Sequence, residues 1–293
     1  MQLDIFEHSR DVMLKNDVVN ALERRDATGA RANRAALFRE YPEFACLADL
    51  DTMIDALVKP APSVQTHQEL ATARQWLADS VEPATFRVMG ISTGHEWVSH
   101  LWKDLATGAA ALPFHPNTPH DHAAPIWLRI GDWARAASAV KTIESWRRKP
   151  IPLSWMLHAN LALAGLQANL GMLAELAWIS PRRLEEVASA TPEPLIKQLV
   201  KKFEASFNGF ETTEDLVWFP AWMLTERPNL AASFALAQPS NHSPAEKAMR
   251  IMIALLGLER QGRHHDIVTE RKHLKDVNQA LFMAYMKDRK SVV

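Results

Sequence analysis

Three histidines and one aspartate lie close together in the chain, at His115, His120, Asp121 and His122. Imidazole and carboxylate groups are the usual ligands of zinc, which needs three or four of them at about 2 Å. The prolines of this stretch could stiffen the loop and point the side chains inward. One interpretation of the segment is therefore the metal centre of a metal-dependent hydrolase.

The same residues also fit a structural role, which we favour. No two of these histidines are four residues apart on a helix, the spacing that anchors zinc in the His-Glu-x-x-His hydrolases. Asp121 or Thr118 is a suitable N-cap for a helix that begins near Ala123, with Pro125 in its first turn. The segment thus predicts a loop and a helix cap, and we assign no metal and no cofactor to the chain.

A second histidine pair, His95 and His100, flanks Glu96. Residues five positions apart lie about 140° apart around an ideal helix, so the two rings cannot face one zinc ion. Thr93 and Glu96 fit a capping box instead. The sequence has no glycine-rich phosphate loop and no Gly-x-Ser-x-Gly elbow, and Cys46 has the apolar neighbours of a core thiol. A non-enzymatic function is favoured.

Tryptophan and arginine gather at two places in the second half of the chain. The protein has ten tryptophans, and Trp and Arg are the residues that most often dominate protein–protein interfaces. The alternative is that the rings pack between helices while the cations stabilise a helix C-terminus. We predict a protein–protein interaction module, an adaptor or a subunit of a larger assembly, whose partner-binding residues are Trp146, Arg147, Arg148, Trp155, Trp218 and Trp222.

The elements that must position these residues are predicted to be helices. Glycine and tyrosine are scarce, with ten and two residues, and no Asn-Gly or Asp-Gly turn separates alternating apolar runs. Apolar residues recur at helical spacing instead, for example at Leu47, Leu50, Ile54 and Leu57. We predict an all-α protein with a single domain over residues 1–293 and a possible sub-division near 113–125.

Three turns of the chain resemble those of the tetratricopeptide repeat. In Gly131–Ala136 a tight turn precedes an aromatic residue and then a small one. A similar order occurs at Arg25–Ala27, with Ala30 and Pro42 following, and again after Gly262. The resemblance covers about a third of the chain and is irregular in spacing. It implies antiparallel helix pairs in a degenerate solenoid or a compact bundle, and a protein partner.

Charge disfavours two classes of partner. Thirty-three basic and thirty-four acidic residues give a net charge of −1, so no global field attracts nucleic acid or an anionic membrane. The segment Leu258–Lys275 is rich in cations, but acids interleave with them, and Ile267 and Leu274 offer a face to the core. A solvated helix pair is favoured there over a nucleic-acid site.

The uncharged segment Leu153–Ala174 has the length of a membrane span. It contains polar residues such as His158 and Asn169, which are costly in hydrocarbon, so we favour a buried helix that breaks near Gly165. The N-terminal residues 1–19 carry acids where a signal peptide needs a basic and then an apolar run. With a single cysteine, this favours a cytoplasmic protein without a membrane partner.

Overall fold

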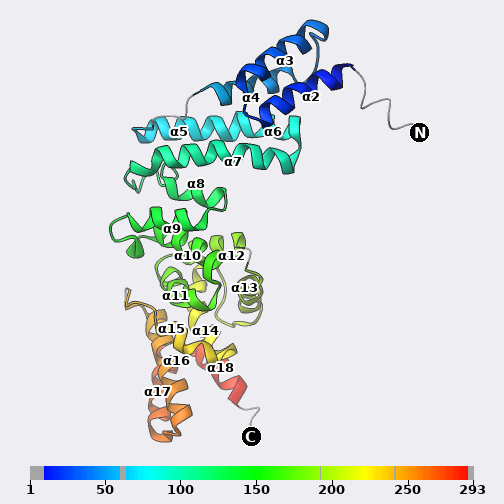
Figure 1. Ribbon diagram of the computed structural model, residues 1–293. Coiled ribbons are helices and arrows are strands. Elements are labelled where there is room, and N and C mark those ends of the chain that lie inside the picture. The colour runs from blue at the N-terminus through cyan, green and yellow to red at the C-terminus, as the bar shows by residue number, and fades with distance from the viewer. Residues whose placement is uncertain (1–9, 60–63, 192, 241, 290–293) are drawn as a thin grey trace, which may run out of the picture. The chain divides into compact units, whose positions relative to one another are not determined.

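The computed structural model describes residues 10–59, 64–191, 193–240 and 242–289. Part of the N-terminal stretch used for the localisation prediction, residues 1–9, lies outside them. The described residues form helices and no strand, which confirms the all-α prediction (Figure 1). The chain divides into two compact units, Met1–Asp132 and Trp133–Val293. Their boundary follows shortly after the segment 113–125, where the sequence allowed a sub-division.

Unit 1 consists of successive helices (Figure 1). The helices are α2 (Arg10–Glu23), α3 (Ala27–Glu40), α4 (Leu47–Val58), α5 (His67–Trp76), the π-helical turn η1 (Leu77–Val81), α6 (Glu82–Met89), α7 (Ile91–Gly108), the 3-10 turn η2 (Ala109–Ala111) and α8 (Ala123–Arg129). The most extensive contacts in this unit are between α2 and α3 and between α6 and α7. This is the packing expected of neighbouring helices joined by tight turns.

The turn between α2 and α3 forms as the sequence predicts. The Asp26 carboxylate caps α3 by accepting a hydrogen bond from the Gly29 amide at 2.8 Å. Ala30 is fully buried between the helices. Its small side chain lets the two helices approach closely. Helix pairs of this kind occur in many all-α folds, so membership of the tetratricopeptide family stays a prediction.

Helices α5 and α6 are continuous through the π-helical turn η1. Pro83 lies in the first turn of α6, and a proline inside a helix removes one amide donor and crowds the preceding turn. The Glu82 amide bonds to the Leu77 carbonyl, five residues back, which is the spacing of a π-helix. The wide turn therefore lies where the regular helical ladder must adjust to the proline.

The predicted capping box at Thr93 and Glu96 is wrong. Helix α7 begins earlier, at Ile91, and its N-cap is Gly90 with a φ of 78°. Gly94 lies at the contact with α6, where an added Cβ would come within 2.8 Å of the Phe86 ring. Glycine at this position thus permits the close packing of α6 and α7.

Unit 2 also consists of helices joined by loops, with no strand among its described residues. Its elements are α9 (Trp133–Lys141), η3 (Trp146–Arg148), α10 (Pro150–Ala164), η4 (Gln167–Asn169), α11 (Leu170–Ile179), α12 (Pro181–Ala190), α13 (Pro194–Ser206), η5 (Thr213–Trp218), α14 (Phe219–Glu226), η6 (Pro228–Leu230), α15 (Ala231–Phe234), α16 (Pro244–Gln261), α17 (His264–Val277) and α18 (Gln279–Arg289). A continuous apolar core joins most of these helices. Phe203 stacks on Phe207 and meets Phe219 and Trp222 edge-on at its centre.

The uncharged segment 153–174 is a buried helix pair, as predicted. Helix α10 ends before Gly165, which has a φ of 72°. The Asn169 side-chain amide donates to the backbone carbonyls of Asn160 and Gly165 at 3.0 and 2.7 Å. These two carbonyls at the helix break therefore have hydrogen-bond partners. In the part of the chain that the structure describes, no helix combines the length and the apolar character of a membrane span.

The cation-rich segment 258–275 forms the end of α16 and most of α17. Ile267 and Leu274 are buried, as the apolar pattern predicted. Cations pair with the interleaved acids, Arg263 with Asp266 at 2.5 Å and Arg271 with Glu259 at 3.7 Å. Ion pairs of this kind are typical of a helix face that is exposed to solvent.

Candidate functional site

The histidine-rich segment of unit 1 starts a helix. Helix α8 begins at Ala123, as predicted, but the cap assigned to Asp121 or Thr118 is wrong. His122 is the N-cap, and its Nδ1 accepts a hydrogen bond from the Ala124 amide at 3.1 Å. His122 is 3% exposed. Burial, and secondarily the neighbouring His67, lower the pKa of His122 to about 4, which keeps the ring neutral and able to accept.

The other residues of the segment point to different partners. Asp121 is buried and lies 3.4 Å from the guanidinium of Arg74. His115 is exposed beside His67, with ring centroids 5.9 Å apart, and His120 is exposed as well. Among the described residues, no three His, Cys, Asp or Glu side chains are placed to hold a metal ion. The segment therefore offers no ligand set for the hydrolase alternative.

The tryptophans that the sequence assigned to a partner surface lie in or against the core of unit 2. Trp222 is 1% exposed and packs on Phe203, and Trp155 is also buried. Trp146 and Trp218 are half-buried against the same core. Trp155 and Trp222 are therefore buried, whereas Trp146 and Trp218 stay partly exposed, and their role in partner binding remains a prediction.

Arg147 and Arg148 hold a surface segment in place. Arg147 forms two hydrogen bonds to the Glu175 carboxylate, at 2.6 and 2.7 Å. Glu175 is only 2% exposed, and it also accepts from the Gln238 amide at 2.6 Å. Arg148 donates to the Pro239 carbonyl. Arg148 therefore binds directly to the residues that precede α16, whereas Arg147 supports them through Glu175.

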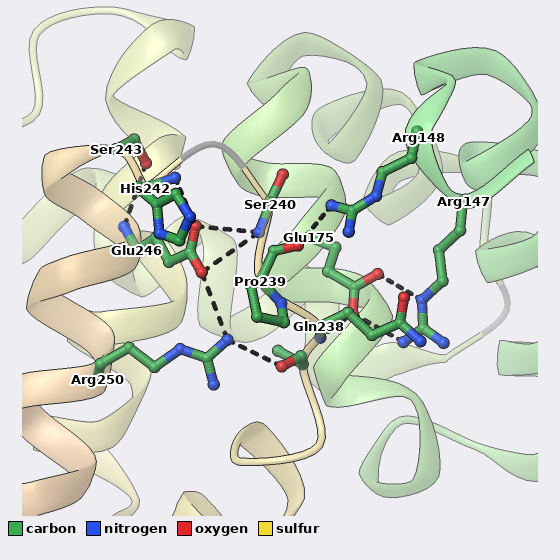
Figure 2. Close-up of polar contacts among 11 residues, drawn as sticks. Arg147, Arg148, Glu175, Gln238, Pro239, Ser240, His242, Ser243, Glu246 and Arg250 are labelled. Carbon is green, nitrogen blue, oxygen red and sulfur yellow. Dashed lines mark hydrogen bonds and ion pairs between the residues drawn. The ribbon is translucent and has the colours of Figure 1, made fainter. Parts of the chain in front are cut away.

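A second carboxylate fixes the other side of this segment, as Figure 2 shows. Glu246 of α16 accepts hydrogen bonds from the amides of Ser240 and His242 at 3.2 and 3.0 Å. Arg250 donates to the Ala237 carbonyl at 2.9 Å and lies 3.4 Å from Glu246. We call residues 237–240, 242 and 243 the clamped segment. Its backbone is held by two buried carboxylates and two arginines.

The feature that sequence reasoning missed is a groove in unit 1 of about 850 Å³. Its walls come from the end of α4, from α5 with the start of η1, and from α7, with the turn after α2 at one side. Helices α5 and α7, which form two of the walls, lie side by side in Figure 1. The lining is mainly apolar and has a charged rim; the groove residues used below are Arg25, Leu57, Lys59, Glu69, Trp76, Leu77, Leu101 and Asp104.

Three contacts help to fix the shape of this groove. The Trp97 indole donates to the Leu22 carbonyl at 2.9 Å, and Arg25 donates back to the Trp97 carbonyl at 3.1 Å. These bonds attach the turn after α2 to α7. Also in the groove lining, the Lys59 ammonium lies 4.0 Å from the Trp76 ring centroid, a cation–π distance. No sequence motif marks these residues as a group, because they come from helices that are distant in the chain.

Comparisons with protein-family models, curated proteins and solved structures found no match for this chain. Its function therefore has to be inferred from the geometry of the groove and of the clamped segment.

Proposed function

We propose that the protein is a non-enzymatic binding module, an adaptor or assembly subunit, and that the groove of unit 1 receives an apolar segment of a partner protein. The observation that carries the proposal is the groove itself, about 850 Å³ in volume with mainly apolar walls. Leu57, Trp76 and Leu101 are half-buried there. Concave apolar sites with a few polar groups are the usual binding sites of proteins.

The chemistry of the walls favours a peptide segment as the occupant. Covering a large apolar side chain contributes about 1.5–3 kcal/mol, and a helix laid between helices covers several at once. The rim carries both signs of charge, with Arg25 and Lys59 against Glu69 and Asp104. Mixed charges around an apolar floor fix the orientation and the choice of a partner more than its affinity.

The construction of the groove supports binding without rearrangement. Leu77 opens the π-helical turn and lines the wall, and π-turns occur frequently at functional sites. The Trp97 and Arg25 bonds attach the turn after α2 to α7. A groove that is already formed costs less conformational entropy on binding.

Site-specific photo-crosslinking in the native cells tests the proposal. A photoreactive phenylalanine replaces Leu101, and cross-linked proteins are identified by mass spectrometry. Leu101→Asp is expected to abolish recovery of the partner because it places a charge on the apolar wall. Leu163→Asp alters an exposed leucine of unit 2 and is the matched control.

Circular dichroism first confirms that both variants are folded. The proposal fails if folded Leu101→Asp recovers the same proteins in the same amounts as the wild type. It fails equally if the photoreactive residue cross-links to no protein.

A further inference from the structure

The turn after helix α13 carries the one Asn-Gly pair of the chain, Asn208–Gly209. Asparagine is among the chemically least durable residues of proteins, and it loses its side-chain amide most readily before glycine. The reason is that glycine has no Cβ to hinder the approach of its backbone nitrogen to the asparagine side chain. A fold can protect such a pair by burying it or by engaging its groups in hydrogen bonds.

This fold leaves both reacting groups accessible. Asn208 is exposed and Gly209 is half-buried. The turn is closed by a hydrogen bond from the Phe210 amide to the Phe207 carbonyl at 3.0 Å, and neither group belongs to the pair. Over the described residues, the Asn208 side chain and the Gly209 amide make no hydrogen bond. An amide outside the hydrogen-bonded network gives up its proton to the solvent readily.

Packing explains why a glycine follows Asn208. A Cβ at Gly209 would come within 2.9 Å of the Phe207 ring and 3.3 Å of the Ala280 Cβ. A side chain at this position would therefore displace Phe207, which is 4% exposed and stacks on Phe203. The glycine that makes the pair reactive is thus one that the core of unit 2 requires.

We propose that Asn208 is a modification site at which the chain deamidates without an enzyme. The Gly209 backbone nitrogen loses its proton and attacks Cγ of Asn208, so a new C–N bond closes a succinimide ring. The bond between Cγ and the side-chain nitrogen breaks, and that nitrogen leaves with the transferred proton as ammonia. Water then opens the ring at either of its carbonyls, which gives aspartate or isoaspartate. Neither residue belongs to the groove in unit 1.

The products disturb the packing beside the turn. The new carboxylate lies just beyond the C-terminus of α13, which ends at Ser206, and a negative charge is unfavourable at that end of a helix. Isoaspartate also adds a methylene to the backbone between Phe207 and Phe210, whose rings contact Phe203 at centroid distances of 4.7 and 5.6 Å. The packing around Phe203 therefore loosens in molecules that have been modified.

Ageing of the purified protein at mildly alkaline pH, followed by peptide mass spectrometry, tests the site. The peptide with Asn208 is expected to lose its amide and to yield both aspartate and isoaspartate, which enzymatic methylation of isoaspartate distinguishes. Asn117 and Asn229 are also exposed and should keep their amides, because Thr118 and Leu230 follow them. An intact Asn208, equal conversion of the three asparagines, or aspartate without isoaspartate at Asn208 would overturn the proposal.

Two substitutions separate the modification from general ageing. Asn208→Gln keeps an amide, but its longer side chain has to close a larger ring, so this variant is expected to retain the amide. Hydrogen exchange around Phe203 and Phe207 is expected to accelerate on ageing in the wild type and in Asn229→Gln, and to stay constant in Asn208→Gln. Equal acceleration in Asn208→Gln, or deamidated wild type that exchanges as slowly as fresh protein, would contradict the effect on the core.

Discussion

Arg147 and Glu175, 28 residues apart in the chain, form a two-pronged ion pair with bonds of 2.6 and 2.7 Å. The pair joins η3 to α11; the Glu175 side chain is buried, and that of Arg147 is 29% exposed. Because Glu175 also binds the Gln238 amide, the carboxylate connects three stretches of unit 2. An arginine that the sequence assigned to a partner surface thus supports the clamped segment.

Removing the arginine from this pair should destabilise unit 2. Arg147→Ala leaves a buried carboxylate without its cation, and such losses cost about 3–5 kcal/mol. The free energy of unfolding, measured by urea denaturation, should fall accordingly. Arg182→Ala removes an exposed partner of Glu186 and should change it by less than about 0.5 kcal/mol. Similar losses in the two variants would contradict the structural role of Arg147.

Stability should depend on pH through His122. Its pKa is about 4 in the folded protein, against the ordinary 6.5. Between these values the unfolded chain binds more protons, so the free energy of unfolding decreases as the pH falls from 6.5 to 4, by about 3 kcal/mol at most. Protonation would also occupy the Nδ1 that caps α8.

Denaturation curves across this pH range test the assignment. His122→Asn keeps a side chain that can cap a helix and should flatten the dependence between pH 4 and 6.5. His100→Asn, at an exposed position, should leave the slope as it is in the wild type. An unchanged slope in His122→Asn would mean that another group causes the pH dependence of stability.

Two glycine-to-alanine substitutions should have opposite effects. At Gly94 the new Cβ would lie 2.8 Å from the Phe86 ring, and such overpacking costs about 1–3 kcal/mol. At Gly257, inside α16, a Cβ meets nothing within 4 Å, so the better helix propensity of alanine should stabilise by about 0.5–1 kcal/mol. Thermal denaturation distinguishes the two, and a stabilised Gly94→Ala would argue against the close α6–α7 contact.

Glu246→Gln should loosen the clamped segment without unfolding the protein. In the wild type, Oε2 accepts from the Ser240 and His242 amides, while Oε1 faces the Ser240 amide and Arg250. Glutamine lacks the negative charge that strengthens these bonds and replaces one oxygen with an NH2 donor. Hydrogen exchange of these two amides should therefore accelerate. Glu186→Gln, an exposed change on α12, should leave both rates unaltered; equal rates in Glu246→Gln would mean that the carboxylate does not hold the segment.

Local features of the sequence predicted local features of the structure. The spacing of Leu47, Leu50 and Ile54 predicted a helix with a buried face, and these residues are buried on α4. Gly165 marked the break in the uncharged segment, because a left-handed conformation is easy for glycine. Signals of this kind act within a few residues, which is why they can be read along the chain.

Local sequence signals did not predict the N-cap residue of α8 correctly. Asp121 is a better cap than His122 by residue preference, yet its carboxylate faces Arg74, which is far away in the sequence. That ion pair leaves the cap position to the histidine. Tertiary contact therefore overrode local preference at the segment that first suggested chemistry.

The sequence by itself determined that the chain is helical, where several of its turns fall, and that the cation-rich segment 258–275 has a buried face. Only the tertiary structure decided which charged groups are supports and where the concave surfaces lie. Arg25, Lys59 and Leu101 meet at one groove through the packing of α4, α5 and α7. Arg147 finds Glu175 across unit 2 in the same way. The physical reason is that helical periodicity is a local property, whereas a groove or a buried ion pair forms between segments whose proximity no local pattern encodes.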